Sequence, residues 1–135
     1  MVQAYSENVT VNAQSAFPFN NVVIEKGCTA TIQGNTILLE KAGIYCVMVD
    51  ASVTPSVAGE IIIDLQKDGQ VLKYAAAQAT GAVGETTSLA FNTLIRCPQN
   101  NTPCCLTAPT SIVLWNDMEE GNVTGGANIV VTKIC

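Results

Sequence analysis

The chain has 135 residues, of which 48% are hydrophobic and only 13% are charged, and its formal net charge is −5. Globular domains carry about 25% charged residues, so the surface is expected to be covered by partners or coated with uncharged polar side chains. The length suits a single domain. The six Lys and Arg residues form no basic run, which excludes the usual electrostatic footprint of a nucleic-acid-binding protein.

Short segments rich in Val, Ile and Thr dominate the chain, and no helical period is sustained. Asp68-Gly69 predicts a tight hairpin, because both residues suit the positive φ angles of a type I′ turn. Residues 74–79 contain good helix formers, so a short helix is the alternative to a strand there. In chain order, strands are predicted at residues 8–14, 21–25, 30–33, 36–40, 44–53, 60–66, 71–76, 86–97, 111–116 and 127–134.

Strands separated by Gly, Pro and Asn turns at short intervals are typical of an all-β protein, and not of alternating β-α units. We therefore predict an antiparallel β-sandwich of the jelly-roll type. Residues 20–135 are expected to form this domain. Residues 1–19 form either its first strand or an N-terminal arm, whose "FPF" at 17–19 could dock on a partner or wrap a neighbouring subunit.

The strand over 44–53 is unusual because both of its faces begin apolar. Tyr45, Val47 and Val49 lead into further apolar residues on one face, which predicts that this face lies in the core. Ile44, Cys46 and Met48 occupy the other face and give way to polar residues. A face that is apolar over half its length indicates coverage by another copy of the chain.

The residues that usually carry chemistry are scarce. The chain has no His, the commonest general base and metal ligand, and it contains no nucleophile-elbow, Walker or Rossmann pattern. Asp117, Glu119 and Glu120 form an acidic stretch whose spacing matches no Ca²⁺ loop. We therefore predict no enzymatic activity, no catalytic residues, no metal site and no cofactor.

The cysteines allow one pairing to be predicted. Cys97 and Cys104 flank the stretch "PQNNTP", which resembles a loop between antiparallel strands, where facing residues lie at disulfide distance. Cys105 is the alternative partner of Cys97, and synthesis in a cytosol favours free thiols at first. A buried Cys46 would act as a small apolar residue. The six cysteines are Cys28, Cys46, Cys97, Cys104, Cys105 and Cys135.

Three stretches together resemble the C1q/TNF-like jelly rolls of bacteria and their phages. They are "NTILLEKAGIYCVMVDASVT", "GEIIIDLQKDGQVL" and "TGGANIVVTKIC". The resemblance covers residues 17 to 135 and implies a compact homotrimer without enzymatic activity. Its motif positions are Ile37, Leu39, Gly43, Tyr45 and Val47, then Leu65 and Gly69, and finally Ile129, Val130, Val131 and Ile134.

Two functions follow as hypotheses. The first is a structural virion protein, a trimeric phage capsid decoration or head-fibre protein whose partner is the major capsid protein or another virion protein. The alternative is a receptor- or glycan-binding knob of a tail fibre or surface adhesin, in which Trp115 would stack on a sugar. An interface role for Trp115, with Ile44, Cys46 and Met48, is the preferred prediction.

The start of the chain bears on where the protein is expected to reside. Residues 1–10 lack the basic and apolar blocks of a signal peptide, and no apolar stretch is long enough for a membrane span. The expected location is the virion, after synthesis in the host cytoplasm, with neither membrane nor nucleic acid as a partner.

Overall fold

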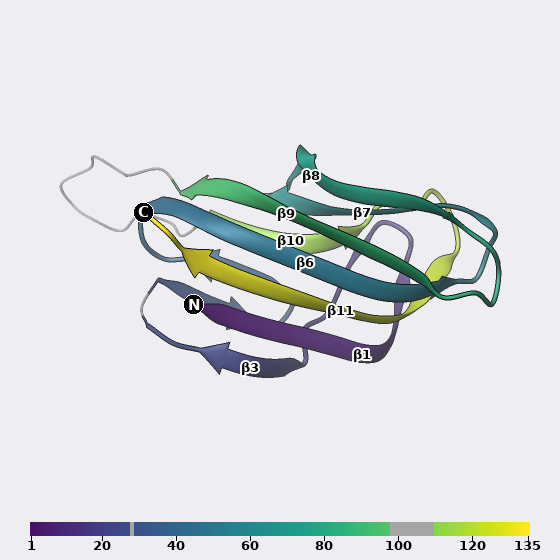
Figure 1. Cartoon of the computed structure of the whole chain (residues 1–135), viewed down its shortest axis with the longest axis horizontal. Helices are drawn as coiled ribbons and strands as arrows, with labels where there is room; N and C mark the ends of the chain where they lie inside the picture. The colour runs from purple at the N-terminus through teal and green to yellow at the C-terminus, as the bar shows by residue number, and fades with distance from the viewer. Residues whose placement is uncertain (28, 98–109) are drawn as a thin grey trace.

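The computed structural model describes residues 1–27, 29–97 and 110–135, and these residues form a sandwich of two antiparallel sheets (Figure 1). The predicted all-β fold is confirmed. The strands are β1 (Val2–Asn12), β2 (Ser15–Ala16), β3 (Asn21–Glu25), β4 (Ala30–Gln33), β5 (Thr36–Leu39), β6 (Gly43–Pro55), β7 (Gly59–Lys67), β8 (Gln70–Gly81), β9 (Thr87–Cys97), β10 (Thr110–Asn116) and β11 (Asn122–Lys133).

One sheet has the strand order β3-β1-β11-β6-β9, and the other has the order β4-β5-β10-β7-β8 with β2 paired to β10. In Figure 1 the first of these, the five-stranded sheet, faces the viewer, with purple β1 beside yellow β11. The first and last long strands are therefore neighbours, and both termini lie at the same end of the sandwich. The order places β3 and β9 at the two edges of the five-stranded sheet.

The strand over 44–53 extends to Gly43–Pro55 in the structure and has the two faces that the sequence predicts. Tyr45, Val47 and Val49 are buried, whereas Ile44 and Met48 on the opposite face are exposed. The alternation continues to the end of β6, as its strand period of two requires. The core assignment of the first face is confirmed.

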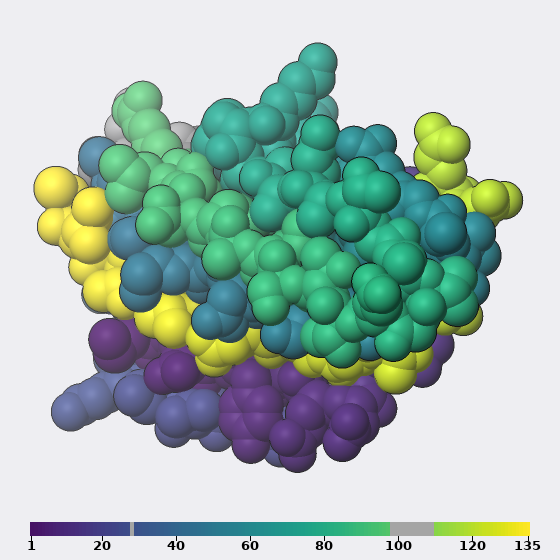
Figure 2. All heavy atoms as spheres, turned by 45° about the vertical axis from the view of Figure 1, so that its right-hand side comes forward, coloured from purple at the N-terminus to yellow at the C-terminus, as the bar shows by residue number. Residues whose placement is uncertain are grey.

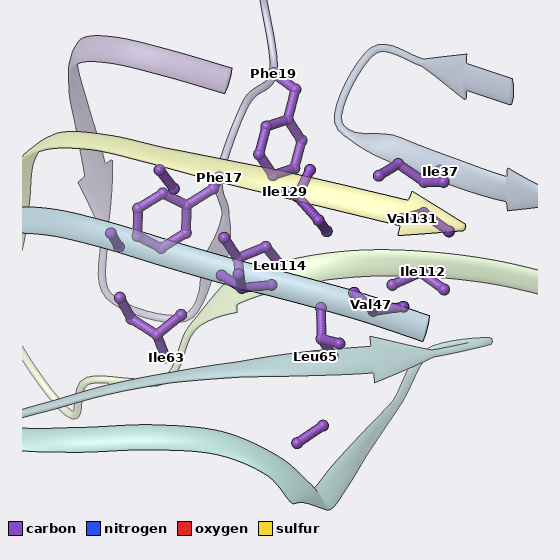
Figure 3. Packing of buried hydrophobic residues seen from close by; sticks show 14 of the residues in the cluster. Phe17, Phe19, Ile37, Val47, Ile63, Leu65, Ile112, Leu114, Ile129 and Val131 are labelled. Carbon is purple, nitrogen blue, oxygen red and sulfur yellow. The ribbon is translucent and has the colours of Figure 1, made fainter. Parts of the chain in front are cut away.

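The core lies between the sheets and is closed by aromatic residues from the segment that follows β2. Phe17 and Phe19 are buried, and the backbone N–H of Phe17 donates to the carbonyl of Leu114 at 2.8 Å. Figure 3 shows both rings packing near Leu114 and Ile129. Burial of such side chains stabilises the fold by roughly 1.5–3 kcal/mol each. These rings are part of the chain's own core, so they are not available to dock on a partner.

The hairpin at Asp68-Gly69 has the predicted geometry, since its φ angles are 50° and 84° and Lys67 pairs with Gln70 across it. The alternative helix over residues 74–79 is wrong, because this segment lies within β8. Its backbone pairs with β7 from Asp64↔Ala76 to Gly59↔Gly81. The free energy gained when β8 pairs with β7 along its length outweighs the few tenths of a kcal/mol per residue by which alanine favours a helix.

The first strand begins earlier than predicted, at Val2, and ends at Asn12, so residues 1–19 contribute β1 and β2 to the sandwich. Its pairing with β11 shifts register between Ser6 and Val9, where Asn8 has a φ of 53°. The shift faces Gly126, whose missing side chain leaves room for the Ser6 carbonyl. The division of the chain into 1–19 and 20–135 stays a prediction.

Candidate functional site

The outer face of the five-stranded sheet carries exposed apolar side chains in register. Cys46 on β6 pairs with Leu94 on β9, and Met48 on β6 pairs with Val130 on β11. Directly opposed residues of antiparallel strands project from the same face. Leu94 is 56% exposed and Met48 is 47% exposed, and with Ile44 they form what we call the apolar face, made of Ile44, Cys46, Met48, Leu94 and Val130.

The outer face of the five-stranded sheet is hollowed beside these residues. A depression of about 650 Å³ crosses β1, β11, β6 and β9, and an adjoining one of about 350 Å³ includes Met48 and Val130. Asp50 and Asn128 line both depressions. Small residues, among them Gly126, make the larger hollow. In Figure 2 the strands of this sheet form successive bands from purple β1 through yellow β11 and blue β6 to green β9.

A second exposed apolar group lies at the edge of the same sheet, on β3. Val22, Val23 and Ile24 are all exposed. The pairing of β1 with β3 skips Val23, since Gln3 pairs with Ile24 and Ala4 with Val22. The third apolar side chain is exposed at this bulge, and β3 has no neighbour beyond it among the strands of the described residues. Natural proteins usually protect exposed edge strands from pairing with other chains. We therefore expect a partner to cover the apolar β3 edge.

The sequence groups Trp115 with Ile44, Cys46 and Met48, and the structure does not bring these four residues together. Trp115 lies in the middle strand of the other sheet, where it pairs with Asp64 on β7 and Ala16 on β2. Its side chain is half-buried and its Nε1 is buried without a hydrogen-bond acceptor in the described part of the chain. Trp115 therefore lies on a different sheet from the other three residues, and the part that each of the four plays in a trimer contact stays a prediction.

Cys97 ends β9 and points into the sandwich. Its Sγ lies 3.4 Å from the hydroxyl of Thr110 and 3.7 Å from the carbonyl oxygen of Leu39, and the side chain is buried. Among the described residues, Cys97 is not bonded to another cysteine. Cys104 and Cys105 lie outside the described residues, so the pairing of Cys97 with either stays a prediction.

A cluster of polar side chains that sequence reasoning missed lies on the outer face of the six-stranded sheet. Asp64 alternates along β7 with the buried core residues Ile63 and Leu65 and so belongs to the outward face, yet it is only 2% exposed. Asp117 follows β10, and its backbone N–H donates to the Ile62 carbonyl at 2.9 Å. This pairing places Asp117 two positions from Trp115 and diagonal to Asp64. The signal in the sequence is an acid among Ile and Leu residues in "IIIDL".

The surroundings of Asp64 disfavour its charged form. Burial raises the pKa of this carboxyl to about 8, and both the hydrogen bond to Asp117 and the negative charge of Asp117 act in the same direction. Asp117 Oδ1 also accepts a hydrogen bond of 2.9 Å from Nε2 of Gln14. Asp64 Oδ1 has no hydrogen-bond partner in the described residues. Asp64 is therefore a neutral acid at pH 7.

Over 1–27, 29–97 and 110–135, no three His, Cys, Asp or Glu side chains converge as metal ligands would. The same ranges hold no helix of the length and apolarity that a transmembrane span needs.

Comparison with known proteins yields matches at the level of structure. No protein-family model matches the sequence, and no curated protein matches it. The matching solved structures include three that share the fold over nearly the whole of both chains. Murine APRIL at pH 5.0 has a TM-score of 0.69 and 11% identity over 98% of each chain.

The other two structures are equally remote in sequence. The globular domain of zebrafish complement 1qA protein has a TM-score of 0.67 and 10% identity over 96% of this chain and 94% of its own. The PRD1 vertex protein P5 has a TM-score of 0.64 and 15% identity over 99% and 96%. Identities this low establish the fold alone. The predicted C1q/TNF-like jelly roll is confirmed.

Proposed function

We propose that this chain is a non-enzymatic structural protein of a virus particle, and that it decorates a phage capsid or forms a head fibre as a homotrimer. The observation that carries the proposal is the exposed apolar face of the five-stranded sheet, in a fold shared with a phage vertex protein. An exposed apolar group of this kind marks an interaction surface. The partner on the capsid is the major capsid protein or another virion protein.

A ring of three subunits uses a heterologous contact, in which one surface of a subunit meets a different surface of the next. The five-stranded sheet offers two such surfaces. The β3 edge presents Val22, Val23 and Ile24, and the opposite side of the sheet presents Leu94 on β9 together with the apolar face. Joining these surfaces would cover both apolar groups at once. It would also leave no exposed β3 edge to pair with other chains.

The oligomeric state tests the first part of this proposal. Purified protein at micromolar concentration should have a mass by light scattering of about 43 kDa, three times the 14.2 kDa of one chain. A mass of one chain under these conditions would overturn the trimer. Partial dissociation on dilution would give the dissociation constant of the trimer and would still support a trimer.

The location on a particle needs a separate experiment. Peptides of this chain should be found by mass spectrometry in density-purified particles, and their amount should remain constant relative to the major capsid protein across the particle peak. A trimer that is absent from particles would overturn the virion role and leave the trimer in place. Specific, saturable binding to a glycan array would instead favour the alternative knob. Trp115 gives that alternative little support, because its Nε1 is buried.

A further inference from the structure

Asp64 on β7 belongs to a row of polar side chains. The row continues to Asp117, which follows β10, and to the turn between β1 and β2. Gln14, in the turn between β1 and β2, donates through Nε2 to Asp117 Oδ1 at 2.9 Å and to the Met118 carbonyl at 2.9 Å. Asp117, directly after β10, accepts from Gln14 on one side and lies diagonal to Asp64 of β7 on the other, and hydrogen bonding to Asp117 contributes to the raised pKa of Asp64. The row Gln14–Asp117–Asp64 thus runs from the turn between β1 and β2, past the end of β10, to β7.

We propose that this row is a proton-dependent clasp, which fastens the turn between β1 and β2 to the six-stranded sheet while Asp64 is protonated and loosens when that proton leaves. In the closed state the Asp64 O–H donates to the Asp117 carboxylate. Loss of the proton to solvent leaves two carboxylates facing each other, with no hydrogen between them. Each carboxylate then requires other hydrogen-bond donors, and the hydrogen bond from Gln14 to Asp117 is disturbed.

The burial of the pair explains why the proton should matter. A carboxylate that is nearly inaccessible to water has no solvation to offset its charge, so it requires donors or a cation. Asp64 Oδ1 has neither among the described residues. The one buried donor nearby that also lacks a partner there is Nε1 of Trp115, on the residue directly opposite Asp64 in the ladder.

The other charged groups around the pair do not replace the proton. On β7, Glu60 lies on the same face and adds negative charge, and the Nζ of Lys67 donates to the Arg96 carbonyl at 2.8 Å. On β8 the residue opposite Asp64 is Ala76, and Lys73 is exposed. Beyond β10, Glu119 and Glu120 are exposed acids. The turn between β1 and β2, together with β2 itself, spans residues 13–16, and none of these residues is charged.

The turn held by the clasp joins the two sheets, because β1 belongs to one and β2 to the other. Its Gln14 has a φ of 58°, in the left-handed region that a non-glycine residue adopts only at an energetic cost. The backbone N–H of Gln14 donates to the Asn116 carbonyl at 2.8 Å, beside the side-chain contact. Loosening the side chain therefore exposes a turn that already carries strain.

The chain's single Trp makes the clasp directly observable. Trp115 faces Asp64, so its fluorescence, excited at a wavelength that tyrosine does not absorb, should change as Asp64 titrates. We expect a sigmoidal change with a midpoint near pH 8 between about pH 6 and about pH 9.5. Asp64→Asn should abolish it, and Asp117→Asn should move its midpoint toward acid. Asp50→Asn, an exposed acid on the other sheet, is the control and should leave it unchanged.

Thiols titrate in the same range, so the Asp64→Asn variant, which retains every cysteine, separates their contribution from that of Asp64. Hydrogen exchange tests the mechanical part of the proposal. After correction for the intrinsic pH dependence, the Gln14 amide should exchange about tenfold faster above the transition than below it. A transition that persists in Asp64→Asn overturns the assignment to Asp64. A Gln14 amide that stays protected while Asp64 titrates overturns the clasp.

Discussion

Met48 on β6 lies directly opposite Val130 on β11, on the outer face of the five-stranded sheet, and nearly half of the Met48 side chain is exposed to solvent in one chain. Its neighbours on that face include Ile44 and Cys46 of the same strand. If a second copy covers this face, Met48 lies within the contact and is buried there. This relationship leads to the first prediction.

Met48→Asp should dissociate the trimer. An unpaired carboxylate buried in the contact costs roughly 3–5 kcal/mol, which corresponds to a weakening of more than about 100-fold per contact. Light scattering across a concentration series measures the effect. Val83→Asp, at an exposed apolar residue in the turn between β8 and β9, is the matched control and should remain trimeric. Trimers of Met48→Asp with unchanged dissociation would show that another surface forms the contact.

Tyr45→Phe should lower the free energy of unfolding by about 1–2 kcal/mol, because it removes a buried hydroxyl that connects two loops. The Tyr45 hydroxyl oxygen lies 2.7 Å from the Lys41 carbonyl oxygen and 2.9 Å from that of Thr29, and the Lys41 N–H donates to it at 3.3 Å. Burial also raises the pKa of this phenol.

Urea unfolding at one fixed protein concentration measures the Tyr45→Phe difference, since assembly would otherwise shift the apparent stability. Tyr74→Phe is the control, because Tyr74 is among the most exposed large side chains of the described residues, and it should unfold at the wild-type midpoint. Equal urea midpoints for the two variants would mean that the hydroxyl of Tyr45 adds nothing to the free energy of unfolding beyond what its ring contributes.

Stability should fall as the pH rises from about 4 to about 8. Asp64 has a pKa of about 8 in the folded chain against its ordinary value of 3.8, so the folded chain retains a proton that the unfolded chain releases. Its contribution therefore declines by up to about 1.4 kcal/mol per pH unit across this window and is constant above it. Thermal unfolding of wild type and Asp64→Asn across this range isolates the contribution as their difference. A difference that does not depend on pH would contradict the prediction.

Gly126→Ala should destabilise the fold by about 2 kcal/mol or more, because a Cβ at this position would lie 2.1 Å from the Ser6 carbonyl oxygen, and backbone atoms have little room to move. The melting temperature measures the loss. Gly34→Asn is the control, since no atom lies within 4 Å of a Cβ there and asparagine tolerates the φ of 60°. A wild-type melting temperature for Gly126→Ala would show that β1 can shift away from β11 without penalty.

Local signals in the sequence were sufficient to predict the sandwich and most of its strands, although the bounds of β1, β8 and β11 differ from the predicted ones and β2 was not predicted. In the predicted strand over 60–66, Ile61, Ile63 and Leu65 are buried, because a strand bounded by turns has one regular geometry and its apolar residues select the buried face. The hairpin at Asp68-Gly69 was equally predictable, since few residue pairs suit two successive positive φ angles. The helix alternative over residues 74–79 failed because propensity carries no information about a partner strand.

What only the tertiary structure decided is which faces lie together and which outward side chains are buried. By itself the sequence determined that Ile44, Cys46 and Met48 share a face, because they alternate along one strand. It did not place Trp115, which requires knowing that β6 and β10 belong to different sheets. Nor did it reveal that the outward Asp64 is buried beside Asp117, because exposure depends on neighbours that are contributed by distant strands and not on the period of β7.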